Sequence, residues 1–255
     1  MILAYGSSPY LEACIRSLLG QSMKSRICIA TSRENEWITG LAKRYRIPVV
    51  VNNGAHGITQ DWNFAMGQAD ARYVTLAHQD DIYEKRYAER AVQALDRASD
   101  PLMYFSDYYE IRGNDRVMSN RNLRIKRLML LPLCCEPLQN SRFIRRRILS
   151  FGSPICCPAV TYVKEALPSP LFDDTFRVAQ DWETWERLSA LKGAFVFDPK
   201  PLMGHRIHEG STTTELIADE TRSKEELNVL QRFWPKPVAG AIEHFYKKGQ
   251  DSNSM

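Results

Sequence analysis

Residues 73–83, YVTLAHQDDIY, contain the pattern that decides the fold. The run 73–77 has strong strand propensity and leads directly into HQDD, so a buried strand is predicted to deliver Asp80 and Asp81 at its carboxyl end. In open α/β sheets, ligands bind at that end. Carboxylate oxygens are preferred by hard cations such as Mg²⁺ and Mn²⁺, and substrate phosphates complete the shell. The stretch therefore predicts a platform for a metal ion and a diphosphate; the alternative is that both acids only cap the next helix.

Composition indicates an ordinary globular protein. The chain has 255 residues, of which 44% are hydrophobic and 25% are charged, and a single α/β domain is the simplest arrangement. It contains no run of about 18 apolar residues, and it does not start with a basic segment followed by an apolar core. We therefore expect a soluble, cytoplasmic protein. Its six cysteines form no Cys-x-x-Cys motif, which favours reduced, mostly buried thiols.

Positive charge is concentrated in the middle of the chain. Between Arg112 and Arg147 there are ten Lys or Arg residues and two acids, a local balance of +8, so the remainder carries −4 of the net +4. Such a basic block suits an anionic membrane surface, a phosphorylated lipid or a nucleic acid. The alternative is a solvated helical face.

The first 108 residues alternate between strand and helix patterns. Helical spacing of apolar residues is found at 11–19, 37–45, 62–69 and 87–95, and strand patterns at 1–5, 26–30, 48–51, 73–77 and 102–108. This alternation predicts a parallel sheet with right-handed crossovers.

Beyond Ile111 the alternation stops. Pro132 and Pro137 interrupt the basic, leucine-rich tract, which predicts short helices or a mobile lobe. Later apolar patterns predict strands at 159–163, 195–197 and 202–207, helices at 180–191 and 215–234, a second C-terminal helix, and a disordered end at 249–255.

Four motifs in order resemble the family 2 glycosyltransferases with the GT-A fold, which are inverting enzymes that use nucleotide-diphospho-sugars. They are AYGSSPYLEACIRSLLGQS (4–22), HQDD (78–81), Gln180-Asp181-Trp182 and His208-Glu209-Gly210-Ser211. The resemblance extends from Met1 to about Ser211. It implies a single GT-A domain over 1–255, with a mostly parallel central sheet covered by helices on both faces and a C-terminal acceptor-side helical region. Residues 1–110 would form the nucleotide-sugar half, 111–235 the acceptor half, and 236–255 a terminal helix and tail.

The same resemblance implies a set of donor-binding residues. Tyr5 would flank the base and Ser32 would face the nucleoside. The full set of nucleotide-sugar contacts is Tyr5, Ser7, Ser32, Asp61, Gln79, Asp80 and Asp81.

Three positions depart from the family pattern. An Asp usually stands where this chain has Ser32, so a carboxylate contact to the base is lost. Asp61-Trp62-Asn63 replaces a common Arg-Asn, although the helical register of Trp62 favours core packing for this residue. His78 replaces the first acid of the Asp-x-Asp segment.

A divalent cation, Mn²⁺ or Mg²⁺, is the cofactor that the resemblance implies. Asp80 stands at the position that binds the ion in the family, and His208 and His78 are further candidate ligands. His205 is an alternative to His208, and a histidine on a strand is often only a structural hydrogen-bond partner.

Asp181 is the candidate general base that deprotonates the acceptor hydroxyl. It lies in the first turn of a predicted helix, where the dipole favours the ionised form; the alternative is a helix cap. Trp182 and Trp185 on the same helix are either core residues or a stacking platform for a sugar. A single base acting in an in-line displacement predicts inversion at the anomeric carbon.

Taken together, these features predict a metal-dependent transferase of the hexosyltransferase type. It would move a sugar from a nucleotide-diphospho-sugar to a hydroxyl of a glycan or lipid-linked acceptor in cell-surface polysaccharide synthesis, with peripheral contact at the cytoplasmic face of the membrane. The alternative is a non-catalytic nucleotide- or nucleic-acid-binding protein on a degenerate GT-A scaffold. The aromatic residues flank acids rather than basic residues, which favours the enzyme and no nucleic acid. A nucleotidyltransferase would need a basic, glycine-rich loop, and Gly6-Ser7-Ser8-Pro9 has no Lys or Arg.

Overall fold

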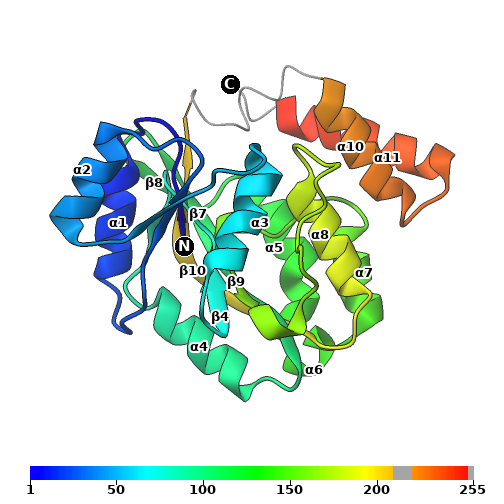
Figure 1. Cartoon of the computed structure of the whole chain (residues 1–255). Helices are drawn as coiled ribbons and strands as arrows, with labels where there is room; N and C mark the ends of the chain where they lie inside the picture. Colours follow the sequence, from blue (N-terminus) through cyan, green and yellow to red (C-terminus); the bar gives the residue numbers. More distant parts are fainter. Residues whose placement is uncertain (209–219, 252–255) are drawn as a thin grey trace.

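The structure is a computed structural model that describes residues 1–208 and 220–251, with the side chains of 220 and 245–251 left out (Figure 1). Three predictions fall wholly or partly outside these residues. They are the Glu209-Gly210-Ser211 part of the last motif, the start of the helix predicted at 215–234, and the last four residues of the predicted disordered end.

The first sheet has four parallel strands in the order β3-β2-β1-β5. Three helices lie between them in sequence, as the alternation predicted. The strands are β1 (Ile2–Leu3), β2 (Ile29–Thr31), β3 (Val49–Val51) and β5 (Ala77–His78), and the helices are α1 (Leu11–Leu19), α2 (Glu36–Tyr45) and α3 (Ile58–Gln68).

Helices cover both faces of this sheet because side chains alternate along each strand. Ile2 and Ile29 are buried in one hydrophobic cluster with α1 and α2. Leu3 and Ala30 point the other way and pack in a second cluster with α3. Figure 1 shows α1 and α2 on one side of the first sheet and α3 on the other.

The second sheet is mixed, with the order β4-β9-β7-β10-β6 and β8 paired to β7. β7 and β10 are parallel, and the other pairs are antiparallel. The strands are β4 (Tyr73–Thr75), β6 (Ile82–Tyr83), β7 (Pro101–Arg112), β8 (Asp115–Val117), β9 (Val160–Val163) and β10 (Ala194–Ile207).

The strand predicted over 73–77 is divided between the two sheets. β4 pairs with β9 in the second sheet, whereas β5 pairs with β1 in the first. Leu76, which is 1% exposed, lies between them. The loop that follows β5 leads into β6, which returns the chain to the second sheet. Residues 79–81 therefore lie where the two sheets meet.

β10 replaces the two strands that were predicted at 195–197 and 202–207. Its pairing with β7 continues through register shifts around Asp198 and Pro201. Proline is tolerated within a strand at such a bulge, so the prolines displace the register without ending the strand. The end of β10 is thereby brought beside β6 and the loop at 79–81.

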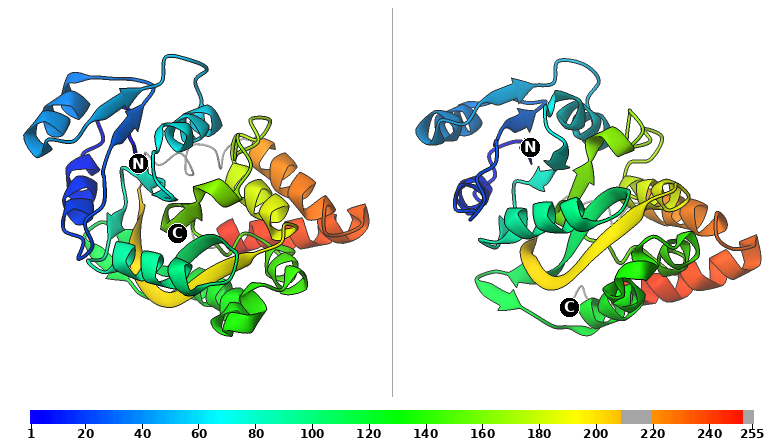
Figure 2. Two further views of the ribbon diagram at one scale, coloured as in Figure 1. Left: turned by 60° about the horizontal axis from the view of Figure 1, so that its bottom comes forward. Right: turned by 90° about the horizontal axis from the view of Figure 1, so that it is seen from below.

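Helices also cover both faces of the second sheet (Figure 2). α4 (Tyr87–Arg97) packs on one face, with Tyr87, Ala91 and Leu95 in the same cluster as Tyr104 of β7. The basic tract forms short helices, as predicted, and these pack with α8 on the other face. The remaining helices are α5 (Arg121–Leu130), η1 (Leu131–Cys134), α6 (Glu136–Gln139), α7 (Arg142–Leu149), η2 (Cys157–Ala159), η3 (Lys164–Ala166), α8 (Gln180–Ser189), α10 (Glu220–Gln231) and α11 (Lys236–Asp251).

Trp62, Trp182 and Trp185, for which the sequence left alternatives open, are core residues. Trp182 is 2% exposed and Trp185 is fully buried, which confirms the core interpretation of this helix face. Trp62 is 9% exposed and packs in the cluster with α3. Cys14, Cys156 and Cys157 are buried, whereas Cys134 and Cys135 are exposed. Within the described ranges, no helix is long and apolar enough to cross a bilayer.

Candidate active site

Asp81 anchors the loop at 79–81 to β10. Its side chain is 1% exposed; Oδ1 accepts a hydrogen bond from the backbone N of Arg206 (2.9 Å) and pairs with Nδ1 of His205 (3.1 Å). Burial alone would raise the pKa of Asp81, but His205, His78 and the Arg206 amide outweigh burial and lower it. The pKa of His205 is raised, because the effect of Asp81 exceeds that of burial. This ion pair fixes the loop against the second sheet.

Asp80 is half-buried and lies between two other segments. Its Oδ1 accepts a hydrogen bond from Ser8 Oγ (2.9 Å), and Oδ2 lies 3.2 Å from Nε2 of His208. The first contact comes from the β1–α1 loop and the second from the end of β10. Ser7, the predicted nucleotide-sugar contact in the same loop, is exposed and stays a candidate, and its neighbour Ser8 makes the contact with Asp80. Neither acid caps a helix, since α4 begins at Tyr87 with Arg86 as N-cap.

Asp80 and His208 fit a divalent cation that takes its remaining ligands from phosphates and water. Two neighbouring ligands of an octahedral Mg²⁺-type ion, each about 2.1 Å from the metal, are about 3 Å apart, close to the separation between Asp80 and His208. No group of three or more His, Cys, Asp or Glu side chains arranged for a metal occurs among the described residues. An ion held by Asp80 and His208 would take the rest of its shell from substrate phosphates and water.

His78 has a different environment. Its ring packs against Trp62 of α3, with centroids 5.2 Å apart, and the buried Nε2 has no hydrogen-bond partner among the described residues. Burial lowers the pKa of His78, so the ring is neutral at physiological pH. A neutral imidazole is the form that binds a metal, so His78 stays a candidate ligand.

Arg206 adds a positive charge that sequence reasoning missed. Its Nε donates a hydrogen bond to the Asp80 carbonyl oxygen (3.0 Å), and its guanidinium lies over the Tyr10 ring at 4.3 Å. The Tyr10 ring also lies 5.0 Å from His208. Arg206 lies on β10, where the sequence showed only a strand pattern, and only the pairing of β10 with β6 brings it to the site.

The predicted nucleoside residues lie at the carboxyl ends of the first sheet. Tyr5 is 60% exposed, and its backbone N and O form hydrogen bonds with the Gln79 side chain (3.1 and 3.0 Å). Ser32 Oγ donates to Asp61 Oδ2 (2.7 Å), and Asn52 Nδ2 donates to Asp61 Oδ1 (2.8 Å). The structure thus places the Asp61 carboxylate, which comes from α3, directly beside Ser32, where the family pattern has its Asp.

Asp181 lies in the first turn of α8, as predicted. The N-cap is Ala179, so the helix-cap alternative for Asp181 is wrong. Asp181 Oδ1 accepts a hydrogen bond from the backbone N of Trp182 (2.7 Å). Burial nevertheless raises the pKa of Asp181, outweighing that amide and the nearby Lys126 and Arg222. The predicted effect of the helix dipole, which favours the ionised form, is therefore opposed by burial.

One buried thiol lies within electrostatic range of both acidic segments. Burial raises the pKa of Cys156, and the negative charges of Asp81 and Asp181 raise it further. The positive charge of Lys126 in α5 opposes both increases, because it acts to lower the pKa of Cys156 and that of Asp181. Lys126 was hidden from sequence reasoning within the basic block, and it belongs to the same neighbourhood as Asp81 and Asp181.

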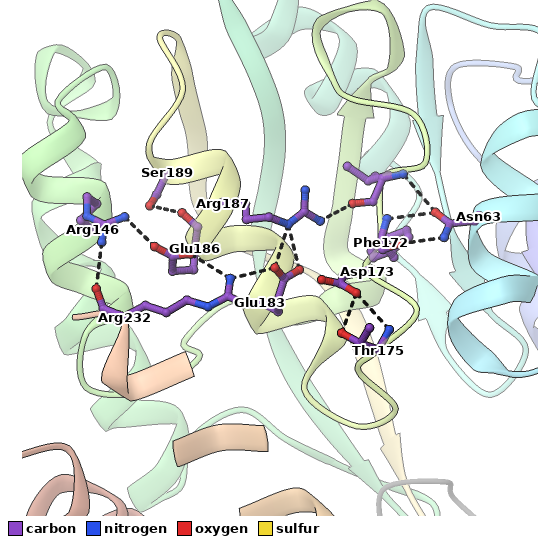
Figure 3. Close-up of polar contacts among 11 residues, drawn as sticks. Asn63, Arg146, Phe172, Asp173, Thr175, Glu183, Glu186, Arg187, Ser189 and Arg232 are labelled. Atoms are coloured by element: carbon purple, nitrogen blue, oxygen red, sulfur yellow. Dashed lines mark hydrogen bonds and ion pairs between the residues drawn. The ribbon is translucent and has the colours of Figure 1, made fainter. Parts of the chain in front are cut away.

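Asn63 of α3 holds the loop that precedes α8 (Figure 3). Its Oδ1 accepts hydrogen bonds from the backbone N of Leu171 (3.1 Å) and of Phe172 (2.9 Å), and its Nδ2 donates to the Phe172 carbonyl oxygen (2.8 Å). Trp62 packs edge-on against the Phe172 ring, with centroids 5.1 Å apart. An open pocket of about 550 Å³ lies beside this clamp, lined by Asn52, Gln60, Asn63, Phe172, Asp173 and Arg187 among others.

We expect the Asn63→Ala substitution to destabilise the fold by about 1–3 kcal/mol, because it removes three hydrogen bonds and leaves backbone groups of the loop unsatisfied. Urea denaturation measures the change. Gln68→Ala, at an exposed position on the same helix, is the control and should stay within about 0.5 kcal/mol of wild type. Equal stabilities of the two variants would show that the clamp contributes nothing.

Comparisons with known proteins identify the family and the fold of the chain. The sequence model of the family described as Glycosyl transferase family 2 matches residues 1–166. A search of curated protein sequences finds no significant match.

Solved structures share the fold over most of the chain. A mannosyltransferase from Pyrobaculum calidifontis, in complex with GDP-Man and Mn²⁺, superimposes with a TM-score of 0.65 at 14% identity, covering 95% of this chain and 68% of that one. S. aureus TarS 1–349 in complex with UDP-GlcNAc gives 0.63 at 15% identity, with coverages of 95% and 69%. Glucosyl-3-phosphoglycerate synthase from Mycobacterium tuberculosis gives 0.54 at 12% identity, with coverages of 91% and 78%. The chain spans 41% of the longer TarS structure.

Proposed function

Because the chain belongs to glycosyl transferase family 2 and has the GT-A fold of these glycosyltransferases, we propose that it moves a sugar from a nucleotide-diphospho-sugar to a hydroxyl group of an acceptor. The observation that carries the proposal is the position of Asp80. Its carboxylate lies at the junction of the two sheets, between Ser8 and His208. The carboxyl end of a parallel strand beside such a junction is where ligands bind in open α/β folds.

The donor diphosphate would lie against Asp80, His208 and Arg206. Breaking the bond between the sugar C1 and the phosphate oxygen builds negative charge on the leaving nucleotide. A divalent cation bound at Asp80 and His208 would supply charge stabilisation worth several kcal/mol. Arg206 would orient the diphosphate through charge-assisted hydrogen bonds, since its guanidinium is fixed by Asp80 and Tyr10.

Asp181 would accept the proton of the attacking hydroxyl. Its pKa is raised by burial, which makes it a stronger base than a solvated aspartate. A single base on the face opposite the leaving group corresponds to a direct displacement, so the product would have the inverted anomeric configuration.

The nucleoside would be held by Tyr5, Ser32 and Asp61. Asp61 would replace the carboxylate that the family pattern has at Ser32, because Ser32 Oγ holds it at 2.7 Å. An aromatic side chain that is 60% exposed, as in Tyr5, offers a face on which a base stacks.

For the donor and acceptor we propose a hexosyl nucleotide and a glycan or lipid-linked hydroxyl, in cell-surface polysaccharide synthesis. The support comes from relatives of the fold that are solved in complex with GDP-Man and Mn²⁺ or with UDP-GlcNAc. The acceptor would enter between α5 and α8, where Lys126 and Asp181 are close enough to influence each other electrostatically.

A thermal-shift and hydrolysis screen tests the proposal. UDP-, GDP-, CMP- and dTDP-sugars are each added with Mn²⁺, with Mg²⁺ or with a chelator. At a ligand concentration 100 times Kd we expect the matching nucleotide-diphospho-sugar to raise Tm by roughly 5–10 °C, and only when the metal is present.

Two variants sharpen this screen. Asp80→Asn should lose the metal-dependent part of the shift, whereas Asp115→Asn, at an exposed position on β8, should keep it. The proposal is abandoned if no nucleotide-sugar raises Tm in a metal-dependent way, or if both variants behave like wild type.

A further inference from the structure

Large exposed apolar side chains are concentrated in one segment. Of the eleven large hydrophobic residues that are markedly exposed among the described side chains, six fall within the 34 residues of 118–151. Exposed apolar side chains that form a continuous surface mark an interaction site. The six are Met118 (47%), Ile125 (48%), Leu128 (69%), Leu131 (60%), Phe143 (67%) and Phe151 (48%).

Three of these residues continue along one side of α5 into η1. Ile125, Leu128 and Leu131 follow one another at intervals of three residues, and Arg121 and Arg124 fall on the same side at helical spacing. The opposite side of α5 is in the core, where Leu123 is fully buried and Leu130 is 3% exposed. α5 therefore has a second apolar face that points out of the protein. We name Arg121, Arg124, Ile125, Leu128 and Leu131 the α5 stripe.

The segment that contains the α5 stripe carries charge of one sign, between the exposed acids Asp115 and Glu136. Residues 116–135 contain five Lys or Arg and no Asp or Glu. Lys126 and Arg127 turn inward, since Lys126 donates a hydrogen bond to Tyr108 Oη (3.0 Å) and Arg127 to Asp107 Oδ2 (2.7 Å). Arg121 and Arg124 stay exposed beside the apolar side chains.

We propose that the α5 stripe docks on a bilayer surface rich in anionic phospholipids. An amphipathic helix with basic residues beside a protruding apolar row lies in the interface, with its apolar side chains among the acyl chains and its arginines at the phosphates. A second copy of this chain suits the stripe less well. A two-fold contact would bring the arginines of both copies together, and three side chains provide far less than the roughly 800 Å² per partner of a stable interface.

Docking at the α5 stripe would place the bilayer next to the candidate active site. Lys126, on the inner side of α5, donates a hydrogen bond to Tyr108 Oη (3.0 Å), and the Tyr108 ring lies 6.2 Å from the ring of His205, the partner of Asp81. The α5 stripe lies on the outer side of the same helix. A hydroxyl acceptor held in the membrane would then reach Asp181 past a single helix. The docking itself does not rest on the proposed reaction, and it is measured without any nucleotide-sugar.

Vesicle flotation tests the docking. The full chain is mixed with vesicles of phosphatidylcholine alone, or with phosphatidylglycerol at roughly one lipid in three. We expect binding only to the anionic vesicles and loss of binding at high salt. Each basic residue near the surface strengthens binding about fivefold, so the double charge reversal R121E/R124E should weaken partitioning at least 25-fold or so. Loss of the apolar contacts in L128S/L131S should also abolish flotation.

Matched controls separate the α5 stripe from general surface effects. Arg97→Glu reverses an exposed charge on α4, and Val238→Ser removes an exposed apolar side chain on α11. Both should float like wild type, and all variants should keep the wild-type Tm within about 2 °C because the positions are exposed. The inference is overturned if wild type binds both vesicle types equally, or if the stripe variants float like the controls. A wild-type dimer that becomes monomeric in L128S/L131S, without vesicle binding, would assign the stripe to a second copy.

Discussion

The Asp181→Asn variant is expected to lose sugar transfer by about 10²–10⁴ in kcat while binding the donor nucleotide as well as wild type does. Asparagine keeps the size of the side chain and its contact with the Trp182 backbone N, but it cannot accept a proton from the acceptor hydroxyl. Initial rates of transfer and calorimetric titration of the nucleotide measure the two effects separately.

The same variant should be more stable than wild type at neutral pH. Because burial raises the pKa of Asp181, the folded chain holds this proton more tightly than the unfolded chain does. Ionisation therefore costs stability as the pH rises through the raised pKa, and asparagine removes that cost. The gain in Tm should be present at pH 7 and shrink as the pH is lowered toward the ordinary aspartate pKa of about 4.

Asp174→Asn, at an exposed acid in the loop before α8, is the control and should change neither transfer nor Tm. Wild-type turnover by Asp181→Asn would remove Asp181 from the mechanism. An unchanged Tm across this pH range would contradict only the argument that burial raises the pKa of Asp181. The role of Asp181 as the base and the effect of its burial are therefore tested independently.

Glu183→Ala is expected to give the largest loss of stability, about 3–5 kcal/mol, because it removes the fully buried carboxylate on which the ion pairs with Arg187 and Arg232 depend. Figure 3 shows the arrangement. The fully buried Glu183 carboxylate accepts hydrogen bonds from Arg187 Nε (2.8 and 3.0 Å) and from Arg232 (2.8 Å). Arg232 also pairs with Glu186 (3.2 Å), which accepts from Arg146 (2.7 Å). Removing Glu183 leaves Arg187 and Arg232 facing each other.

Thermal and urea denaturation should show a decrease in Tm on the order of 10 °C for Glu183→Ala. Glu136→Ala, an exposed acid at the start of α6, should change stability by less than about 0.5 kcal/mol. A small loss in Glu183→Ala, comparable with that of the control, would mean that the network in Figure 3 is no stronger than a surface ion pair.

Local patterns predicted most of the elements of the fold but not their pairing. Apolar spacing located α1, α2 and α4 within about two residues, because each helix buries one face. The split at Leu76 could not be predicted, since β4 and β5 share one uninterrupted apolar pattern and only their different partners separate them. The continuity of β10 across Pro201 was hidden for the opposite reason, because a proline suggests a break unless the neighbouring strand accommodates a bulge.

The candidate site also combines residues that local patterns mark with residues that only tertiary contacts bring in. Asp80, Asp81 and Asp181 stand next to strong strand or helix signals, so the sequence singled them out as candidates. Ser8, Lys126 and Arg206 enter through tertiary contacts, and nothing in their neighbouring residues distinguishes them from surface polar residues. The partnership of Ser32 with Asp61 connects two positions that looked like separate departures from the family pattern.

The passage of the chain through Leu76 has a thermodynamic consequence. Among the described residues, the strands of each sheet are hydrogen-bonded only to strands of the same sheet. The short loop after β5 is one of the few segments that connect the two sheets. A donor held by Ser8 and Asp80 on one side and by Arg206 and His208 on the other would act as a cross-link between the two halves. Its binding free energy would then oppose the separation of the halves as well as the opening of the loop, so substrate occupancy would govern the rigidity of the whole molecule.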